Sequence, residues 1–206
     1  MVERQYETNV FVNCPFDAAY RPLFDAIVFT IHDCGFASRS ALEIFDTSQV
    51  RIDKIGHIIA DCKFGVHDIS RTEPDTVTGL PRFNMPLELG LFLGAKRFGT
   101  GKQKLKNCLV LDVERYRYQQ FISDIAGQDI VAHGGTTAMA IRAVRDWLSD
   151  APPASRIPGA SAMVRRYETF RNELPAMCEG QGLVAEELTF NEYVLQMEEW
   201  LAVQRA

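Results

Sequence analysis

The stretch "PRFNMPLELGLFLGAK" at residues 81–96 carries one acid, Glu88, just inside an apolar run with helical spacing. If Met85 is the N-cap, Pro86 takes the first helical position, which proline favours, and Glu88 takes N3, the position of a capping-box acid. If Asn84 is the N-cap, Glu88 lies at N4. In either register the carboxylate interacts favourably with the helix dipole, by about 0.3–1 kcal/mol. The alternative is chemistry, because a carboxylate can stabilise or attack an oxocarbenium-like sugar during glycosidic cleavage.

Further polar and aromatic residues lie where two predicted strands end and in the loop that leads to Glu88: Asn13, Phe16, Asp17, Asp68, Arg71, Arg82 and Asn84. The carboxylate of Asp68 could bind a ribose hydroxyl, or could cap a turn or pair with Arg71. The two arginines could clamp a phosphate or pyrophosphate, or could be solvated loop residues. These residue types together suit a nucleotide, with Phe16 available to stack on a base.

Short β-rich runs alternate with helical stretches along residues 9–150. The sequence predicts strands at 9–16, 37–45, 64–70, 107–113 and 129–133, and helices at 18–36, 48–63, 84–97, 115–127 and 136–150. Such alternation predicts a parallel sheet with helices on both faces. Right-handed crossovers favour a three-layer, doubly wound, flavodoxin-like α/β fold with five strands in the order 2-1-3-4-5.

The chain should therefore comprise an α/β domain at 1–150, a linker at 151–159 rich in proline and serine, and a C-terminal helical appendage at 160–206 formed by a pair of helices. In a doubly wound sheet, ligands bind beyond the carboxyl ends of the strands, where the strand order reverses. That rule places Asn13, Asp68 and Glu88 at the same edge. Alternation along the strand turns His67 away from Asp68, and we expect His67 to be structural.

Composition excludes several classes of function. The 206 residues carry a net charge of −5, which argues against a nucleic-acid or membrane-surface role. The five cysteines form no CxxC pair and the four histidines no HxxxH or HxH spacing, so we expect reduced thiols and no metal site. The N-terminus lacks the apolar segment of a secretory leader, and no apolar run is long enough to span a bilayer. We expect a soluble cytoplasmic protein.

The order of elements, with the "NCPFD" turn, the "HDISR" strand end and an N-x-P-x-E-L-G helix, resembles the TIR-like and nucleoside 2-deoxyribosyltransferase-like superfamily. The resemblance covers about residues 8–150. In both groups a catalytic glutamate lies at the corresponding helix, and Glu88 in "LELG" matches that placement. The approach to the glutamate differs, because "RFNMP" replaces the segments found in either group.

The resemblance implies cleavage of an N-glycosidic bond, most concretely the release of nicotinamide from NAD as substrate, with no cofactor. It also implies self-association, and a role such as an effector in bacterial stress or phage defence. One alternative is a nucleoside 2-deoxyribosyltransferase or nucleoside hydrolase that uses the same glutamate. Another is a binding module that senses a nucleotide or mediates assembly without turnover.

Overall fold

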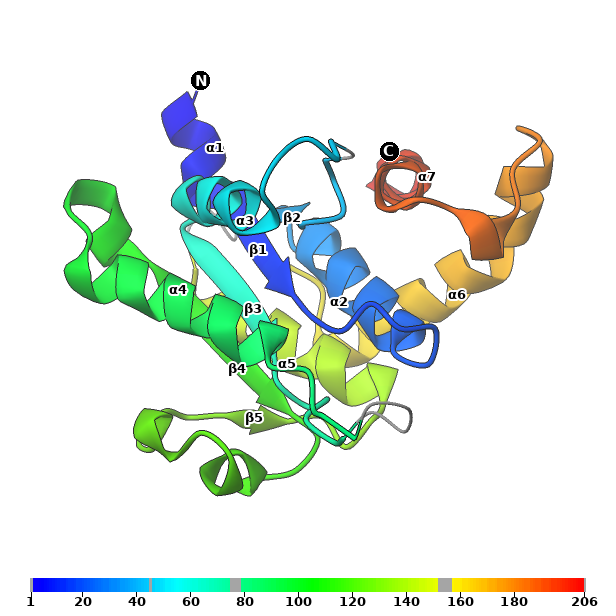
Figure 1. Ribbon diagram of the computed structural model, residues 1–206. Coiled ribbons are helices and arrows are strands. Elements are labelled where there is room, and N and C mark those ends of the chain that lie inside the picture. Colours follow the sequence, from blue (N-terminus) through cyan, green and yellow to red (C-terminus); the bar gives the residue numbers. More distant parts are fainter. Residues whose placement is uncertain (1, 45, 75–78, 152–156, 206) are drawn as a thin grey trace.

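The computed structural model describes residues 2–44, 46–74, 79–151 and 157–205, with the core built on one five-stranded parallel sheet (Figure 1). The strand order is β2-β1-β3-β4-β5, which confirms the predicted flavodoxin-like order. The strands are β1 (Asn9–Asn13), β2 (Ala37–Arg39), β3 (Phe64–Asp68), β4 (Asn107–Asp112) and β5 (Val131–Ala132). In the three central strands nearly all residues are buried, as expected of a parallel sheet covered on both faces.

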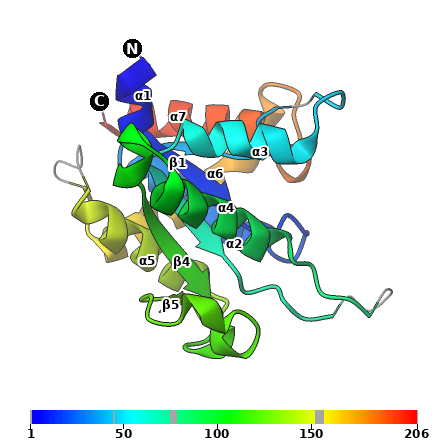
Figure 2. The same ribbon diagram turned by 60° about the vertical axis from the view of Figure 1, so that its left-hand side comes forward.

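Helices cover both faces of the sheet, as Figures 1 and 2 show. One face packs against α2 (Arg21–Asp33) and α5 (Thr137–Ser149), and the other against α3 (Arg51–Ala60) and α4 (Asn84–Phe98). Alternation along β1 divides its side chains between the two faces: Val10 and Val12 join the α2 side, and Phe11 joins the α3 side.

The two C-terminal helices, α6 (Ala160–Glu179) and α7 (Phe190–Arg205), confirm the predicted helical pair and pack on the outer side of α2 (Figure 1). The ring of Phe29 on α2 lies 5.5 Å from that of Phe170 and 6.0 Å from that of Trp200. Because α2 lies between the sheet and this pair, it is apolar around most of its circumference. Arg166 adds an ion pair to the buried Asp33 at 2.9 Å.

Several shorter elements differ from the sequence-based expectation. The predicted second strand ends at Arg39 because the chain turns there and Arg39 pairs with Glu43 at 2.5 Å. The predicted helix at 115–127 is instead two short 3-10 helices, η2 (Arg117–Gln120) and η3 (Ser123–Ile125). The two helices are separate because Ile122, which lies between them, has a non-helical backbone with φ −148° and ψ 58°.

Three further short helices were not predicted: α1 (Val2–Thr8), η1 (Gly101–Leu105) and η4 (Ala185–Glu187).

The predicted linker at 151–159 and the predicted loop before α4 each lie partly outside the described residues. None of the helices that the structure describes has the length and apolar composition needed to cross a bilayer.

Candidate functional site

Glu88 lies on the side of α4 that faces the sheet. The buried residues of this helix are Met85, Glu88, Leu89 and Phe92, spaced as one helical stripe. The first helical hydrogen bond runs from Leu87 N to Phe83 O at 3.0 Å, so Phe83 is the N-cap. Glu88 is therefore at N5, and both predicted capping registers are wrong. The acid occupies a core position rather than a cap.

Burial changes the acidity of Glu88. The residue is 4% exposed, and none of the hydrogen bonds among the described residues involves its carboxyl group. Burial raises its pKa to about 7, and the positive charge of Arg51 at the start of α3 offsets part of that rise. A carboxyl with this pKa can exist in both protonation states near neutral pH, which is the property of an acid–base catalyst.

Asn13 connects the end of β1 to the start of α4. Its Nδ2 donates hydrogen bonds to His67 Nδ1 at 3.0 Å and to Met85 O at 2.9 Å. Both donors of the amide are thus used, whereas the buried Oδ1 has no hydrogen-bond partner in the described part of the chain. Met85 lies one turn before Glu88, so this unpaired acceptor lies at the same edge as the carboxyl group. An unpaired buried acceptor needs an explanation, and a bound ligand or water supplies one.

His67 faces α4 and serves the packing of the sheet. Burial, with a smaller contribution from the charge of Lys106, lowers the pKa of His67 to about 3, so the ring is neutral at pH 7. Its ring lies 4.9 Å from that of Phe92, and both are close to Gly65 on β3. A Cβ on Gly65 would lie 2.8 Å from His67 Nε2 and 2.9 Å from the Phe92 ring. The absence of a side chain at Gly65 therefore permits α4 to lie this close to the sheet.

Gly65→Ala should consequently lower the free energy of unfolding by about 1–3 kcal/mol, because the Phe92 ring and α4 must shift. Gly56→Ala on α3 is the matched control: its Cβ would meet no atom within 4 Å, and alanine is the better helix former by up to about 1 kcal/mol. Urea denaturation of both variants measures the difference. Equal effects would mean that close packing at Gly65 is not required.

Asp68 lies at the end of β3 and points to the opposite face of the sheet. Its Oδ2 accepts a hydrogen bond from Tyr20 Oη at 2.5 Å and lies 2.9 Å from His133 Nε2, outside hydrogen-bonding geometry. Its Oδ1 accepts from Ser70 N at 2.8 Å. Burial raises the pKa of Tyr20 well above its ordinary value, so Tyr20 keeps its proton. Asp68 is fully buried, and its hydrogen bonds join the turn before α2 to the segment that follows β3.

The remaining predicted residues divide into a pair and separate positions. Arg71 pairs with Asp17 at 3.1 Å rather than with Asp68, and this joins the loops after β1 and β3. Arg82 and Asn84 are exposed around the start of α4.

Phe16 is 39% exposed and contacts Phe24 edge-on, with 5.7 Å between ring centroids. The structure thus brings Asn13 toward the Glu88 helix and Asp17 to Arg71, but it does not bring Asp68 to the Glu88 side.

Sequence reasoning missed Arg117 and Asp112. Arg117 Nη2 donates to Asp112 Oδ1 at 2.6 Å, to Ser70 O at 2.7 Å and to Ile69 O at 3.2 Å. Its Nη1 donates to Thr72 Oγ1 at 2.9 Å. This one side chain therefore fixes the segment that follows β3. Asp112 is the last residue of β4 and His133 directly follows β5, so the rule that assigns strand ends to the ligand edge could have identified both.

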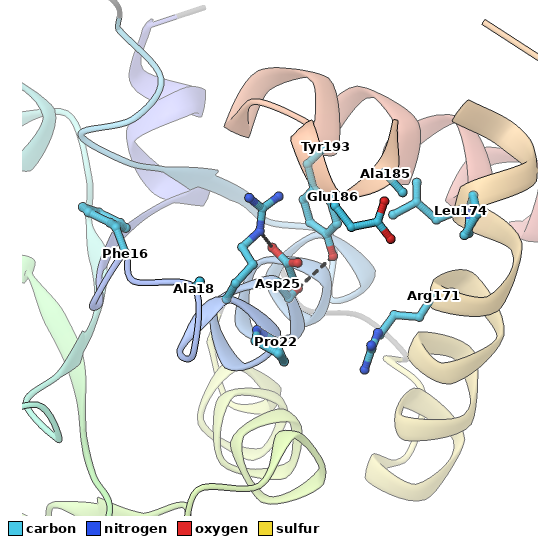
Figure 3. Close-up of a pocket in the computed structure, with 11 residues that line it drawn as sticks. Phe16, Ala18, Pro22, Asp25, Arg171, Leu174, Ala185, Glu186 and Tyr193 are labelled. Carbon is cyan, nitrogen blue, oxygen red and sulfur yellow. Dashed lines mark hydrogen bonds and ion pairs between the residues drawn. The ribbon is translucent and has the colours of Figure 1, made fainter. Parts of the chain in front are cut away.

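A cavity of about 530 Å³ opens beside Phe16, between the start of α2 and the C-terminal helices (Figure 3). In it Arg21 pairs with Asp25 at 2.7 Å, and Tyr193 donates a hydrogen bond to Asp25 O at 3.1 Å. Burial raises the pKa of Asp25 to about 6, although Arg21 opposes the rise. Phe16 thus faces the α2 side, away from the helix that carries Glu88.

Within the described ranges, no group of three histidine, cysteine, aspartate or glutamate side chains is placed to hold a metal ion. Comparison of the chain with models of protein families, with curated proteins and with solved structures gives no match.

Proposed function

We propose that the chain cleaves an N-glycosidic bond of a nucleotide and that NAD, with nicotinamide as the leaving group, is the first substrate to test. The observation that carries this proposal is the position of Glu88. This carboxyl group, which makes no hydrogen bond to any described residue, occupies a core position of α4 at the carboxyl edge of the sheet, and its pKa is about 7. A carboxylate is the group that glycosidic cleavage requires.

In the proposed reaction the bond between C1′ of the ribose and the pyridinium nitrogen breaks, and its electron pair leaves with neutral nicotinamide. The ionised Glu88 stabilises or attacks the cationic sugar. Water then adds to C1′ and loses a proton; where Glu88 has formed an ester with C1′, that C–O bond breaks and the carboxylate is regenerated, so the products are nicotinamide, ADP-ribose and a proton. Asn13 Oδ1, the unpaired acceptor, would receive a hydrogen bond from a ribose hydroxyl. Asp68, fully engaged by its own partners, would act only by positioning the loops.

Activity on NAD should rise with pH through about 7, because the free enzyme is competent only when Glu88 is ionised. Arg51→Met should move this midpoint to higher pH, since the charge of Arg51 lowers the pKa of Glu88. Chromatography of the products across a pH series gives the profile of kcat/KM. Lys96→Met, an exposed charge change on α4 itself, is the control and should leave the midpoint in place.

A second candidate is cleavage of neutral nucleosides or deoxynucleosides, in which the leaving base needs a proton. The raised pKa of Glu88 favours this candidate, because a large protonated fraction at neutral pH could supply that proton. Parallel incubations with NAD and with deoxynucleosides distinguish the two reactions by the base released. If neither substrate yields a product at any pH or protein concentration, both proposed reactions are wrong. The remaining interpretation is then a nucleotide-binding module.

A further inference from the structure

The outward side of α4 is apolar where a surface helix is normally polar. Phe83, Leu87, Leu91 and Phe98 are 59%, 56%, 36% and 80% exposed. At about 100° per residue, these four and the two glycines at 90 and 94 lie within an arc of about 100°. We call these six residues the outer face of α4.

The described part of the chain leaves this face uncovered. The main contacts of α4 are with the sheet, with α3 and with η1, whereas α6 and α7 pack against α2 and α5 on the other side of the sheet. Figure 2 shows α4 at the front of the molecule with no other element over it. A Cβ at Gly90 or Gly94 would meet no atom within 4 Å. Both glycines therefore leave open space on the helix surface and are not needed for packing within the chain. An exposed apolar face of this length indicates a protein contact.

We propose that the outer face of α4 forms the contact of a two-fold symmetric dimer of this chain, with the two α4 helices antiparallel. The spacing of large and small residues supports a second copy as the partner. When Leu87 is placed opposite Gly94 of the second copy, the same register places Leu91 opposite Gly90. Each leucine then meets a glycine, and two-fold symmetry repeats both pairings. A face that supplies both the projecting residues and the grooves is complementary to itself.

The ends of the helix fit the same register. Phe83 of one copy lies opposite Phe98 of the other, so the two exposed aromatic rings of the outer face of α4 cover each other. Arg97, a charged residue at the margin of the face, lies opposite Asn84 in this arrangement. A parallel pairing would instead place the two Arg97 side chains next to each other and align the helix dipoles unfavourably.

The size of the contact sets the expected affinity. α4 has 15 residues and is therefore about 22 Å long, which gives a smaller contact than the roughly 800 Å² per partner of a standard interface. We expect a monomer–dimer equilibrium in the micromolar range. The proposal does not depend on the activity of Glu88, which lies on the inner side of the same helix.

Sedimentation velocity of the full chain, from low to high micromolar concentration, tests the proposal. The wild-type chain should shift from monomer to dimer. Gly94→Leu should weaken the dimer at least about tenfold, because the new side chain meets Leu87 of the second copy. The monomer should stay folded, since the space around Gly94 is open. Leu87→Ala combined with Gly94→Leu restores a large residue opposite a small one and should recover the dimer.

Gly56→Leu on α3 is the matched control, because it adds the same side chain at another open helical glycine. It should leave the equilibrium unchanged. A wild-type chain that is monomeric at all concentrations would overturn the proposal. A Gly94→Leu variant that dimerises as strongly as the wild type would also overturn it. The same holds if the variant with both Leu87→Ala and Gly94→Leu stays monomeric while circular dichroism shows that it and Gly94→Leu are folded.

Discussion

Glu88→Gln is expected to stabilise the protein at pH 8 and to lower the rate of nucleotide cleavage sharply. The folded pKa of about 7 lies above the ordinary value of 4.5, so the folded state binds the proton more tightly than the unfolded chain does. The contribution of Glu88 to stability is therefore full below about pH 4.5 and is lost as the pH rises through about 7. The difference in pKa corresponds to about 3 kcal/mol, which the neutral glutamine should recover at pH 8 and not at pH 4.

Urea denaturation of the wild type and of Glu88→Gln at both pH values measures this difference. Asp53→Asn is the control, because Asp53 is an exposed acid in the first turn of α3 and its loss should change stability by less than about 0.5 kcal/mol. If Glu88→Gln lowers stability equally at pH 4 and pH 8, the carboxylate serves the helix rather than the chemistry. The same variant should lower the rate of nucleotide cleavage by about a hundredfold or more.

Such a result would have a clear physical meaning. An ionised group that lowers stability at the working pH is typical of an active site, where activity and stability oppose each other. Glutamine has nearly the same shape, so its effect reports on the charge and not on packing. The combination of higher stability and lost activity would distinguish a catalytic carboxylate from a helix cap, whose removal lowers stability.

Arg117→Met is expected to lower the free energy of unfolding by about 3–5 kcal/mol. Asp112 is fully buried, and its charge is balanced by Arg117 at 2.6 Å, so the variant leaves a buried carboxylate without compensation. Burial already raises the pKa of Asp112 although Arg117 opposes it, which shows how unfavourable the charge would be alone. Thermal and urea denaturation at pH 8 measure the loss.

Two further variants test the cause. Arg117→Met combined with Asp112→Asn removes both charges and should recover part of the lost stability. Arg115→Met removes an exposed arginine from the same segment and should have little effect. If the double variant is no more stable than Arg117→Met alone, the bonds from Arg117 to Ile69 O and Ser70 O matter more than the buried charge.

The order of the strands could be predicted because each helix and strand has its own local pattern. The apolar run Val10, Phe11 and Val12 indicates a buried strand, and α5 begins after Thr136, a typical N-cap residue whose side chain accepts a hydrogen bond from Met139 N at 3.4 Å. Right-handed crossovers then leave few arrangements of five parallel strands. The residues at the carboxyl edge followed from that topology.

Contacts between distant segments could not be predicted in the same way. Arg117, in the segment predicted as a helix, reaches the buried Asp112 and two carbonyl groups after β3, and no local pattern predicts those partners. For Asp68 the sequence left open a ribose hydroxyl, a turn cap or a pair with Arg71, and it did not predict that Tyr20 from the turn before α2 donates a hydrogen bond to it. Ion pairs and hydrogen bonds between residues that are tens of positions apart in the sequence form only when the chain is folded.

The sequence by itself determined the parallel sheet, its strand order, the C-terminal pair of helices and the placement of an acid early in the helix after β3. These follow from periodicity, from chain chirality and from helix signals, which are local. Only the tertiary structure decided that Glu88 belongs to the buried side of α4, that Asp68 faces the other side of the sheet, and that the opposite side of α4 is left apolar and open. Those properties depend on which elements pack together, because burial and pairing are properties of the whole fold.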